Sequence, residues 1–167
     1  YLVTNDIDMN QISSNGYQAA SVGFNGSLKS EQNTIDTILY DRLPNQGGDI
    51  NYHSIINLKI NQPTYIGNYA SYGLFSSLFG VVENLNFVNT IITTDDLDQS
   101  SLRDEILVGA ISGQTNHAVI TNVHVNSQTT ISDSLDVISH LSMGGLVGKG
   151  SGNISYSTTN GSLVGGS

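Results

Sequence analysis

The chain has 167 residues with a formal net charge of −9, 18 Gly, no Cys and no Trp, and only 11% of it is charged, against roughly 25% in an average domain. This composition excludes a coiled coil, a disordered tail and any framework of disulfides or cysteine-bound zinc. The acidic charge opposes binding to nucleic acid or to an anionic membrane, and no apolar stretch approaches the roughly 18 residues of a membrane span. The length fits one domain.

Short stretches of alternating apolar and polar residues predict β-strands along most of the chain. Turn dipeptides such as Asn25-Gly26 and Asn160-Gly161 separate them. Helical spacing of apolar residues is rare, and the one exception, at 95–107, is polar enough to be a loop or a short surface helix. In chain order, the predicted strands lie at 54–61, 85–93, 119–125, 154–159 and 162–164.

Three phrases in the chain share one form, in which two glycines bracket mostly apolar residues and a strand follows. The strand at 54–61 matches the second half of this form without a preceding glycine phrase. In this alignment Asn57, Asn84 and Asn122 occupy one column, with Tyr156 in that place in the last copy. The glycine phrases lie at 73–80, 109–113 and 144–148, and their strands lie at 81–89, 119–126 and 153–160.

Repeats of this length indicate stacked units that share one core, and strand-rich units without helices favour an all-β parallel β-solenoid. Glycines would then lie at its corners, and Leu85, Phe87, Val123 and Val125 would point inward and stack on one another. The Asn column would form an internal amide ladder. A β-sandwich of short strands is the alternative.

The last of these repeats is similar to a known family. Gly-Gly-Leu-Val-Gly at 144–148, Ser-Gly-Asn-Ile-Ser-Tyr-Ser at 151–157 and Gly-Ser-Leu-Val-Gly at 161–165 resemble the GLUG motif of bacterial surface proteins. Tyr-Gly-Leu-Phe at 72–75 with Glu-Asn-Leu at 83–85 resembles the more degenerate repeats that precede this motif.

The resemblance implies a right-handed parallel β-helix in a large secreted or surface-anchored protein. Such proteins include adhesins, which act in virulence, and immunoglobulin A-cleaving metallopeptidases, in which the repeats lie N-terminal. Residues 1–167 would then be a single β-helical fragment of a longer protein, with insertions at 29–53 and 94–107. The implied location is extracellular, at the bacterial cell surface, and the family has no catalytic residue within the repeat.

Candidate chemistry in the chain is sparse, and no enzyme is expected. His-Glu-x-x-His is absent, and His117 and His124 are expected to be ordinary surface residues. Asp6 with Asp8 and Asp133 with Asp136 form the nearest carboxylate pairs, without a supporting basic residue nearby in the sequence. One group of acidic residues could hold calcium, the only cofactor that the sequence suggests, and a solvated loop is the alternative. This group comprises Asp95, Asp96, Asp98, Asp104 and Glu105.

These observations predict a structural and adhesive module that binds a host surface protein or a glycan. Tyr65, Tyr69 and Tyr72 are the candidate ligand contacts, with core packing as their alternative role. A second hypothesis is the non-catalytic N-terminal β-helix of a secreted immunoglobulin-cleaving zinc metallopeptidase. A third, a glycan-cleaving β-helix, requires two acidic side chains in one groove. The fragment is expected to be monomeric, without nucleic-acid binding or membrane insertion.

Overall fold

The computed structural model describes residues 1–11, 17–18, 23–30, 52–93, 105–132 and 140–164. Within them the chain is almost entirely β-strand, and its only helical element is the 3-10 turn η1 (Met9–Gln11). The strands are β1 (Leu2–Val3), β2 (Ile7–Asp8), β3 (Tyr17–Gln18), β4 (Ser27–Ser30), β5 (Ser54–Ile56), β6 (Lys59–Gln62), β7 (Thr64–Ile66), β8 (Tyr69–Tyr72), β9 (Phe75–Leu78), β10 (Val81–Val88), β11 (Ile91–Thr93), β12 (Glu105–Gly109), β13 (Ser112–Ser132), β14 (Leu141–Gly144), β15 (Val147–Ser155) and β16 (Thr158–Val164).

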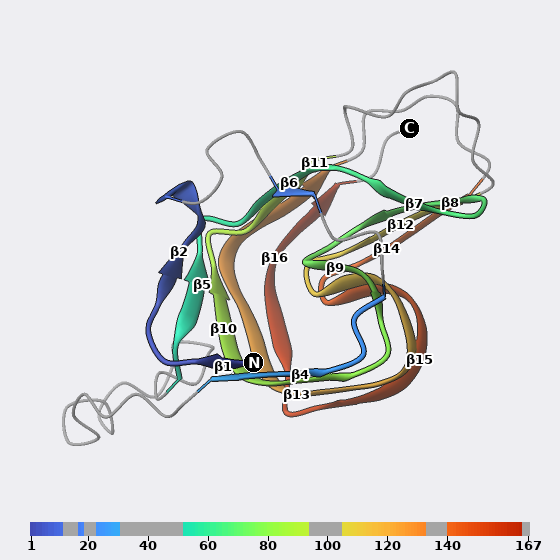
Figure 1. The fold of residues 1–167 in the computed structure, drawn as a ribbon. Helices are drawn as coiled ribbons and strands as arrows, with labels where there is room; N and C mark the ends of the chain where they lie inside the picture. Colours follow the sequence, from blue (N-terminus) through green and yellow to red (C-terminus); the bar gives the residue numbers. More distant parts are fainter. Residues whose placement is uncertain (12–16, 19–22, 31–51, 94–104, 133–139, 165–167) are drawn as a thin grey trace.

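The strands of the described residues pair in parallel, except that β7 and β8 form an antiparallel hairpin. The larger sheet has the order β1-β4-β10-β13-β11-β6-β3, with β2, β5, β9, β15 and β16 attached beside this path. The smaller sheet has the order β14-β12-β8-β7. Parallel neighbours need a long connection between them, and Figure 1 shows how the chain supplies it, by returning to the same sides on each pass.

Equivalent residues recur at the same place on successive passes. Leu28 pairs with Val82, Val82 with Ile120, and Ile120 with Ile154. The offset between equivalent residues is 38 residues on one pass and 34 on the next. The repeat therefore varies in length while its strands keep a common register.

The predicted inward-facing residues are confirmed as core. Leu85, Phe87, Val123 and Val125 have no exposed surface. Leu85 pairs with Val123, and Phe87 with Val125, so each apolar side chain lies beside its equivalent on the next pass. Because side chains alternate between the two faces of a strand, the polar residues between them face outward.

Asparagines in the left-handed backbone region form corners, between strands at Asn57 and Asn89 and within β10 and β13 at Asn84 and Asn122. The sequence alignment placed Asn57 in one column with Asn84 and Asn122, and this is wrong for Asn57. Ile56 pairs with Val88, which places Asn57 beside Asn89, whereas Asn84 lies beside Asn122 as predicted. Asn accepts this backbone more readily than most residues. The φ angles are 59° at Asn57, 58° at Asn84, 56° at Asn89, 52° at Asn122 and 49° at Tyr156.

The first glycines of the three phrases occupy one column. Tyr72 pairs with Val108 and Val108 with Met143, so Gly73, Gly109 and Gly144 follow at equivalent positions. A Cβ on Gly109 would lie 2.7 Å from the backbone nitrogen of Gly148, which explains why two backbones can pass here only without side chains. The closing glycine of the first phrase, Gly80, does not align with the closing glycine of the second phrase. Val81 pairs with Val119, so Gly80 aligns with Ala118 instead.

Several predicted boundaries are also corrected. The strand at 54–61 is split into β5 and β6 at Asn57, and the strand at 154–159 is split into β15 and β16 at Tyr156. Residues 105–107, predicted as part of a loop or helix and of the insertion at 94–107, lie in β12 and are buried. Residues 29 and 30, assigned to the insertion at 29–53, lie in β4. The sequence places both insertion boundaries too far into the repeat.

Candidate functional site

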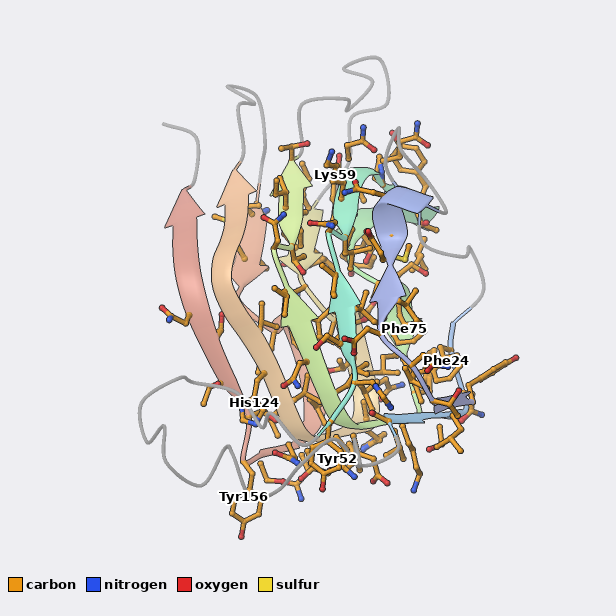
Figure 2. All side chains as sticks on the ribbon, turned by 90° about the vertical axis from the view of Figure 1, so that its left-hand side faces the viewer. Phe24, Tyr52, Lys59, Phe75, His124 and Tyr156 are labelled. Atoms are coloured by element: carbon orange, nitrogen blue, oxygen red, sulfur yellow. The ribbon has the colours of Figure 1, made fainter. Side chains whose placement is uncertain are left out.

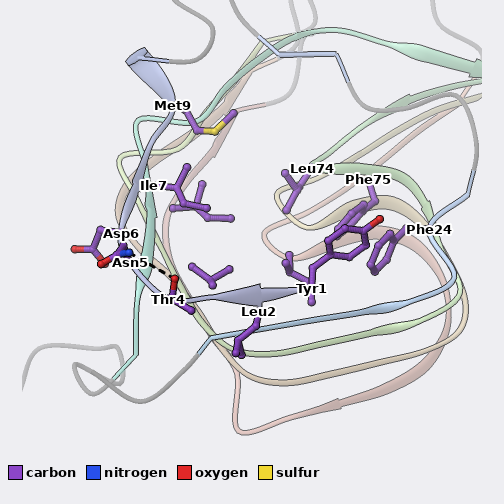
Figure 3. A pocket seen from close by; sticks show the side chains of 13 residues that line it. Tyr1, Leu2, Thr4, Asn5, Asp6, Ile7, Met9, Phe24, Leu74 and Phe75 are labelled. Atoms are coloured by element: carbon purple, nitrogen blue, oxygen red, sulfur yellow. Dashed lines mark hydrogen bonds between the residues drawn. The ribbon is translucent and has the colours of Figure 1, made fainter. Parts of the chain in front are cut away.

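An open apolar hollow of about 670 Å³ lies at the end of the strand stack formed by β1 and β2 (Figure 3). Tyr1, Phe24 and Phe75 gather on one side of it, and Ile7 and Met9 lie on the opposite side. The rings of Phe24 and Phe75 stack with centroids 4.4 Å apart, and the ring of Tyr1 lies 6.0 Å from that of Phe24. Aromatic side chains in such contact offer a rigid apolar surface. The sequence did not predict this hollow.

The carboxylates of Asp6 and Asp8, near this hollow, are engaged in backbone and amide contacts. Asp6 Oδ1 accepts a hydrogen bond of 2.8 Å from the Ser54 backbone nitrogen. Asp8 Oδ1 accepts bonds of 3.0 Å from the Asn10 backbone nitrogen and of 3.0 Å from Asn57 Nδ2. These contacts join β2 to β5, a structural role. The other predicted carboxylate pair, Asp133 with Asp136, lies outside the described residues.

The three tyrosines do not form one surface cluster. Tyr72 is completely buried, so the prediction that it contacts a ligand is wrong and its alternative role in the core is confirmed. In the β7–β8 hairpin Tyr65 pairs with Ala70, and Ile66 with Tyr69. Paired residues share a face and neighbours alternate, so Tyr65 and Tyr69 lie on opposite faces of the hairpin. Tyr65 is 40% exposed.

Tyr69 belongs to a polar cluster that spans three passes of the chain. Lys149 Nζ lies 5.9 Å from the centroid of its ring and donates a 2.6 Å hydrogen bond to Glu105 Oε2. Ser142 Oγ donates a 2.6 Å bond to Glu105 Oε1. The Lys149 side chain is about half exposed, whereas the Glu105 side chain is mostly covered. Parallel pairing creates this cluster, since Tyr69 pairs with Glu105 on adjacent strands.

Mutual hydrogen bonding shifts both ionisable groups toward their charged forms. The hydrogen bonds from Lys149 and then Ser142 hold the pKa of the Glu105 carboxyl below its usual range. The hydrogen bond to Glu105 raises the pKa of the Lys149 amine. The cluster therefore presents a fixed ammonium group beside an aromatic ring around neutral pH.

The predicted calcium group is not assembled among the described residues. Asp95, Asp96, Asp98 and Asp104 lie outside them, and Glu105 is held by Lys149 and Ser142. The part of the chain that the structure describes contains no group of three acidic, His or Cys side chains arranged to hold a metal ion. Calcium binding by this segment stays a prediction.

Two short amide ladders join the passes at their corners. Asn89 Nδ2 donates to Asn57 Oδ1 at 2.6 Å, and Asn57 donates in turn to Asp8. Asn122 Nδ2 donates to Asn84 Oδ1 at 3.0 Å. The predicted single ladder is therefore two separate ladders, both partly buried. Each lies at a corner with left-handed backbone, and the Asn residues in the sequence indicated these corners.

His124 adjoins the second ladder, and the prediction that it is a surface residue is wrong. It is 8% exposed, with Nε2 2.9 Å from Asn122 Oδ1 and Nδ1 2.8 Å from Thr158 Oγ1. Figure 2 shows it on the outer side of the strands, near Tyr52. His117, in contrast, is exposed at a corner with φ of 55°. The histidine contacts observed here are structural.

No protein-family model, curated protein or solved structure matches the chain. Among the described residues, no helix has the length and apolar character needed to cross a membrane.

Proposed function

We propose that the chain is part of a right-handed parallel β-helix that serves as a structural and adhesive module of a bacterial secreted or surface-anchored protein. Its in-register parallel pairing supports a β-helix rather than a β-sandwich, whose sheets are antiparallel. The glycine column and the asparagine corners recur once per pass, as a coil with a fixed outline requires.

The observation that carries the adhesive role is the cluster of Tyr69, Glu105, Ser142 and Lys149. It combines a partly exposed aromatic ring with a fixed ammonium group and a carboxylate. Rings of this kind bind the apolar faces of sugars, while adjacent charged groups bond their hydroxyls. A host glycan is therefore the ligand that this surface suits best, and a host surface protein is the second class.

The test is a glycan array and a panel of host matrix proteins, probed with the intact chain and with Tyr69→Ala. Loss of the ring is expected to weaken glycan binding about tenfold, which corresponds to about 1.4 kcal/mol. The matched control is Tyr156→Ala, because Tyr156 is 86% exposed and lies between β15 and β16 of the larger sheet, whereas Tyr69, Glu105 and Ser142 belong to the smaller sheet. Equal loss in both variants, or binding by neither the chain nor its variants, would contradict the assignment of this surface.

A further inference from the structure

The cluster around Tyr69 lies on strands that have neighbours on both sides. Tyr69 is on β8, between β7 and β12, and Glu105 is on β12, between β8 and β14. Figure 1 shows these four strands side by side, projecting to one side of the molecule. A ligand on the face of this sheet therefore meets side chains from successive passes, and strands added at the edges of the sheet leave that face as it is.

Lys149 by itself would attract an acidic ligand to this face. Its side chain is about half exposed, and its ammonium group lies 5.9 Å from the centroid of the Tyr69 ring. A sugar stacked on the ring would place its substituents near this group, and an ammonium group bonds more strongly to a carboxylate or a sulfate than to a hydroxyl. The ring and the lysine alone would therefore favour acidic sugars.

Glu105 opposes this preference because it is ionised and touches the same ammonium group. Its Oε2 accepts the 2.6 Å hydrogen bond from Lys149 Nζ, and its Oε1 accepts a 2.6 Å hydrogen bond from Ser142 Oγ. These two bonds hold the pKa of the Glu105 carboxyl below its usual range, so the pair has no net charge around neutral pH. A ligand carboxylate bonded to Lys149 would also lie close to the Glu105 carboxylate. Because Coulomb energy falls only as the inverse of distance, this repulsion offsets most of the attraction.

We propose that Glu105 determines the charge selectivity of the surface around Tyr69, so that this surface binds neutral sugars and excludes acidic ones. The inference rests on the proposed glycan-binding role and names the class of glycan that fits it. A neutral sugar keeps its contact with the ring and its hydroxyls accept hydrogen bonds from Lys149, without repulsion from Glu105. The net charge of −9 on the chain opposes acidic sugars as well, over a longer range.

Among the described residues, His140 is the other titratable group whose charge acts on Glu105. Ile106 pairs with Leu141, which aligns His140 with Glu105 on the same face of the smaller sheet. A positive charge on this imidazole would restore part of the attraction for an acidic sugar. Binding is therefore measured at about pH 8, where histidine side chains are in general neutral.

The experiment measures the binding of three matched pairs of oligosaccharides to the intact chain. One member of each pair ends in galactose, glucose or mannose, and the other ends in the corresponding uronic acid, so the two differ by one carboxylate. The unaltered chain is expected to bind the neutral member at least about tenfold more tightly, because like charges oppose the acidic one. In Glu105→Gln, affinity for the neutral member stays within about threefold, and affinity for the acidic member rises at least about tenfold, because Lys149 is no longer neutralised.

Two further variants assign this gain to the charge on Lys149. The double variant with Glu105→Gln and Lys149→Gln is expected to lose the gain for the acidic sugar. Glu83→Gln is the matched control, because Glu83 forms a similar ion pair with the half-exposed Lys29 in the larger sheet. Its loss changes the net charge by the same amount, and the preference for neutral sugars is expected to stay as in the unaltered chain.

The outcomes separate this inference from the proposed function. If Tyr69→Ala weakens binding of the neutral sugar but Glu105→Gln gains nothing for the acidic one, the role of Glu105 is overturned and the glycan-binding role stands. A preference of the unaltered chain for acidic sugars overturns the inference without any variant. An equal gain in Glu83→Gln, or loss of the neutral sugar in Glu105→Gln, overturns it too. Binding of none of these probes and of no glycan on the array overturns both proposals.

Discussion

Replacing Asn122 by Ala and, separately, by Gly tests whether left-handed corners hold the passes in register. Asn122 has φ of 52°, donates from Nδ2 to Asn84 Oδ1 at 3.0 Å, and lies with Oδ1 2.9 Å from His124 Nε2. Both substitutions remove the same two side-chain hydrogen bonds. They differ in the backbone, because Gly adopts a positive φ without strain and Ala does not.

The expected sizes follow from these contacts. Loss of two hydrogen bonds, at about 0.5–1.5 kcal/mol each, lowers the free energy of unfolding by about 1–3 kcal/mol in both variants. Ala adds about 1–2 kcal/mol for the left-handed backbone, of which the smaller unfolded-state entropy of Ala returns about 0.4–1 kcal/mol. Asn122→Ala is therefore expected to be less stable than Asn122→Gly by about 1 kcal/mol.

The neighbouring Thr121 provides a matched control. It pairs with Glu83 and Ser155 inside β13 and has no positive φ. There the order reverses, since Gly in an extended strand is less stable than Ala by roughly 0.5–1 kcal/mol. The four variants are compared by urea unfolding, with equal m-values required for the comparison. The same order of Ala and Gly at both positions would refute the corner assignment.

Two further predictions concern the close approach of backbones and the ionised cluster. Gly148→Ala is expected to lower the urea midpoint more than Gly67→Ala, because the added Cβ at Gly148 would lie 2.7 Å from the Val108 backbone nitrogen. Gly67 has open space around it but a φ of 56°, so its Ala variant carries only the left-handed backbone cost of about 1–2 kcal/mol. Equal effects at the two positions would contradict the close packing at Gly148. The Glu105 carboxyl has a lowered pKa in the folded chain, so its stabilising effect is complete above the ordinary value of 4.5 and is lost as pH falls through the folded pKa. Glu105→Gln should therefore flatten the loss of stability between about pH 7 and about pH 3, measured by urea midpoints, while unchanged pH dependence would exclude this contribution.

The repeat could be recognised in the sequence because each pass needs the same residue types at equivalent positions. Alternation alone identified Phe87 and Val125 as core, and glycines marked where backbones approach. Register was harder to read. Asn57-Leu58 and Asn84-Leu85 have the same letters and both lie at corners, but they are different corners, because Asn57 bonds with Asn89.

Nearness in sequence was equally misleading for the candidate site. Tyr65, Tyr69 and Tyr72 lie within eight residues of sequence. Because side chains alternate along a strand, Tyr65 and Tyr69 lie on opposite faces of the hairpin, and Tyr72 is buried in the core. The partners of Tyr69 are distant instead: Glu105 reaches it from the next pass, and Lys149 from the one after. No local sequence pattern predicts such a cluster, because its formation depends on how many residues each pass contains.

The sequence by itself determined that this chain is all-β, repetitive and stabilised by a shared apolar core, because those properties follow from residue type and local spacing. The tertiary structure alone decided which asparagines bond, that Glu105 and Lys149 meet, and that an apolar hollow is open at one end. The physical reason is that strands pair through their backbones, whose hydrogen-bonding groups are the same for nearly every residue. Register is then set by the packing of all the side chains together.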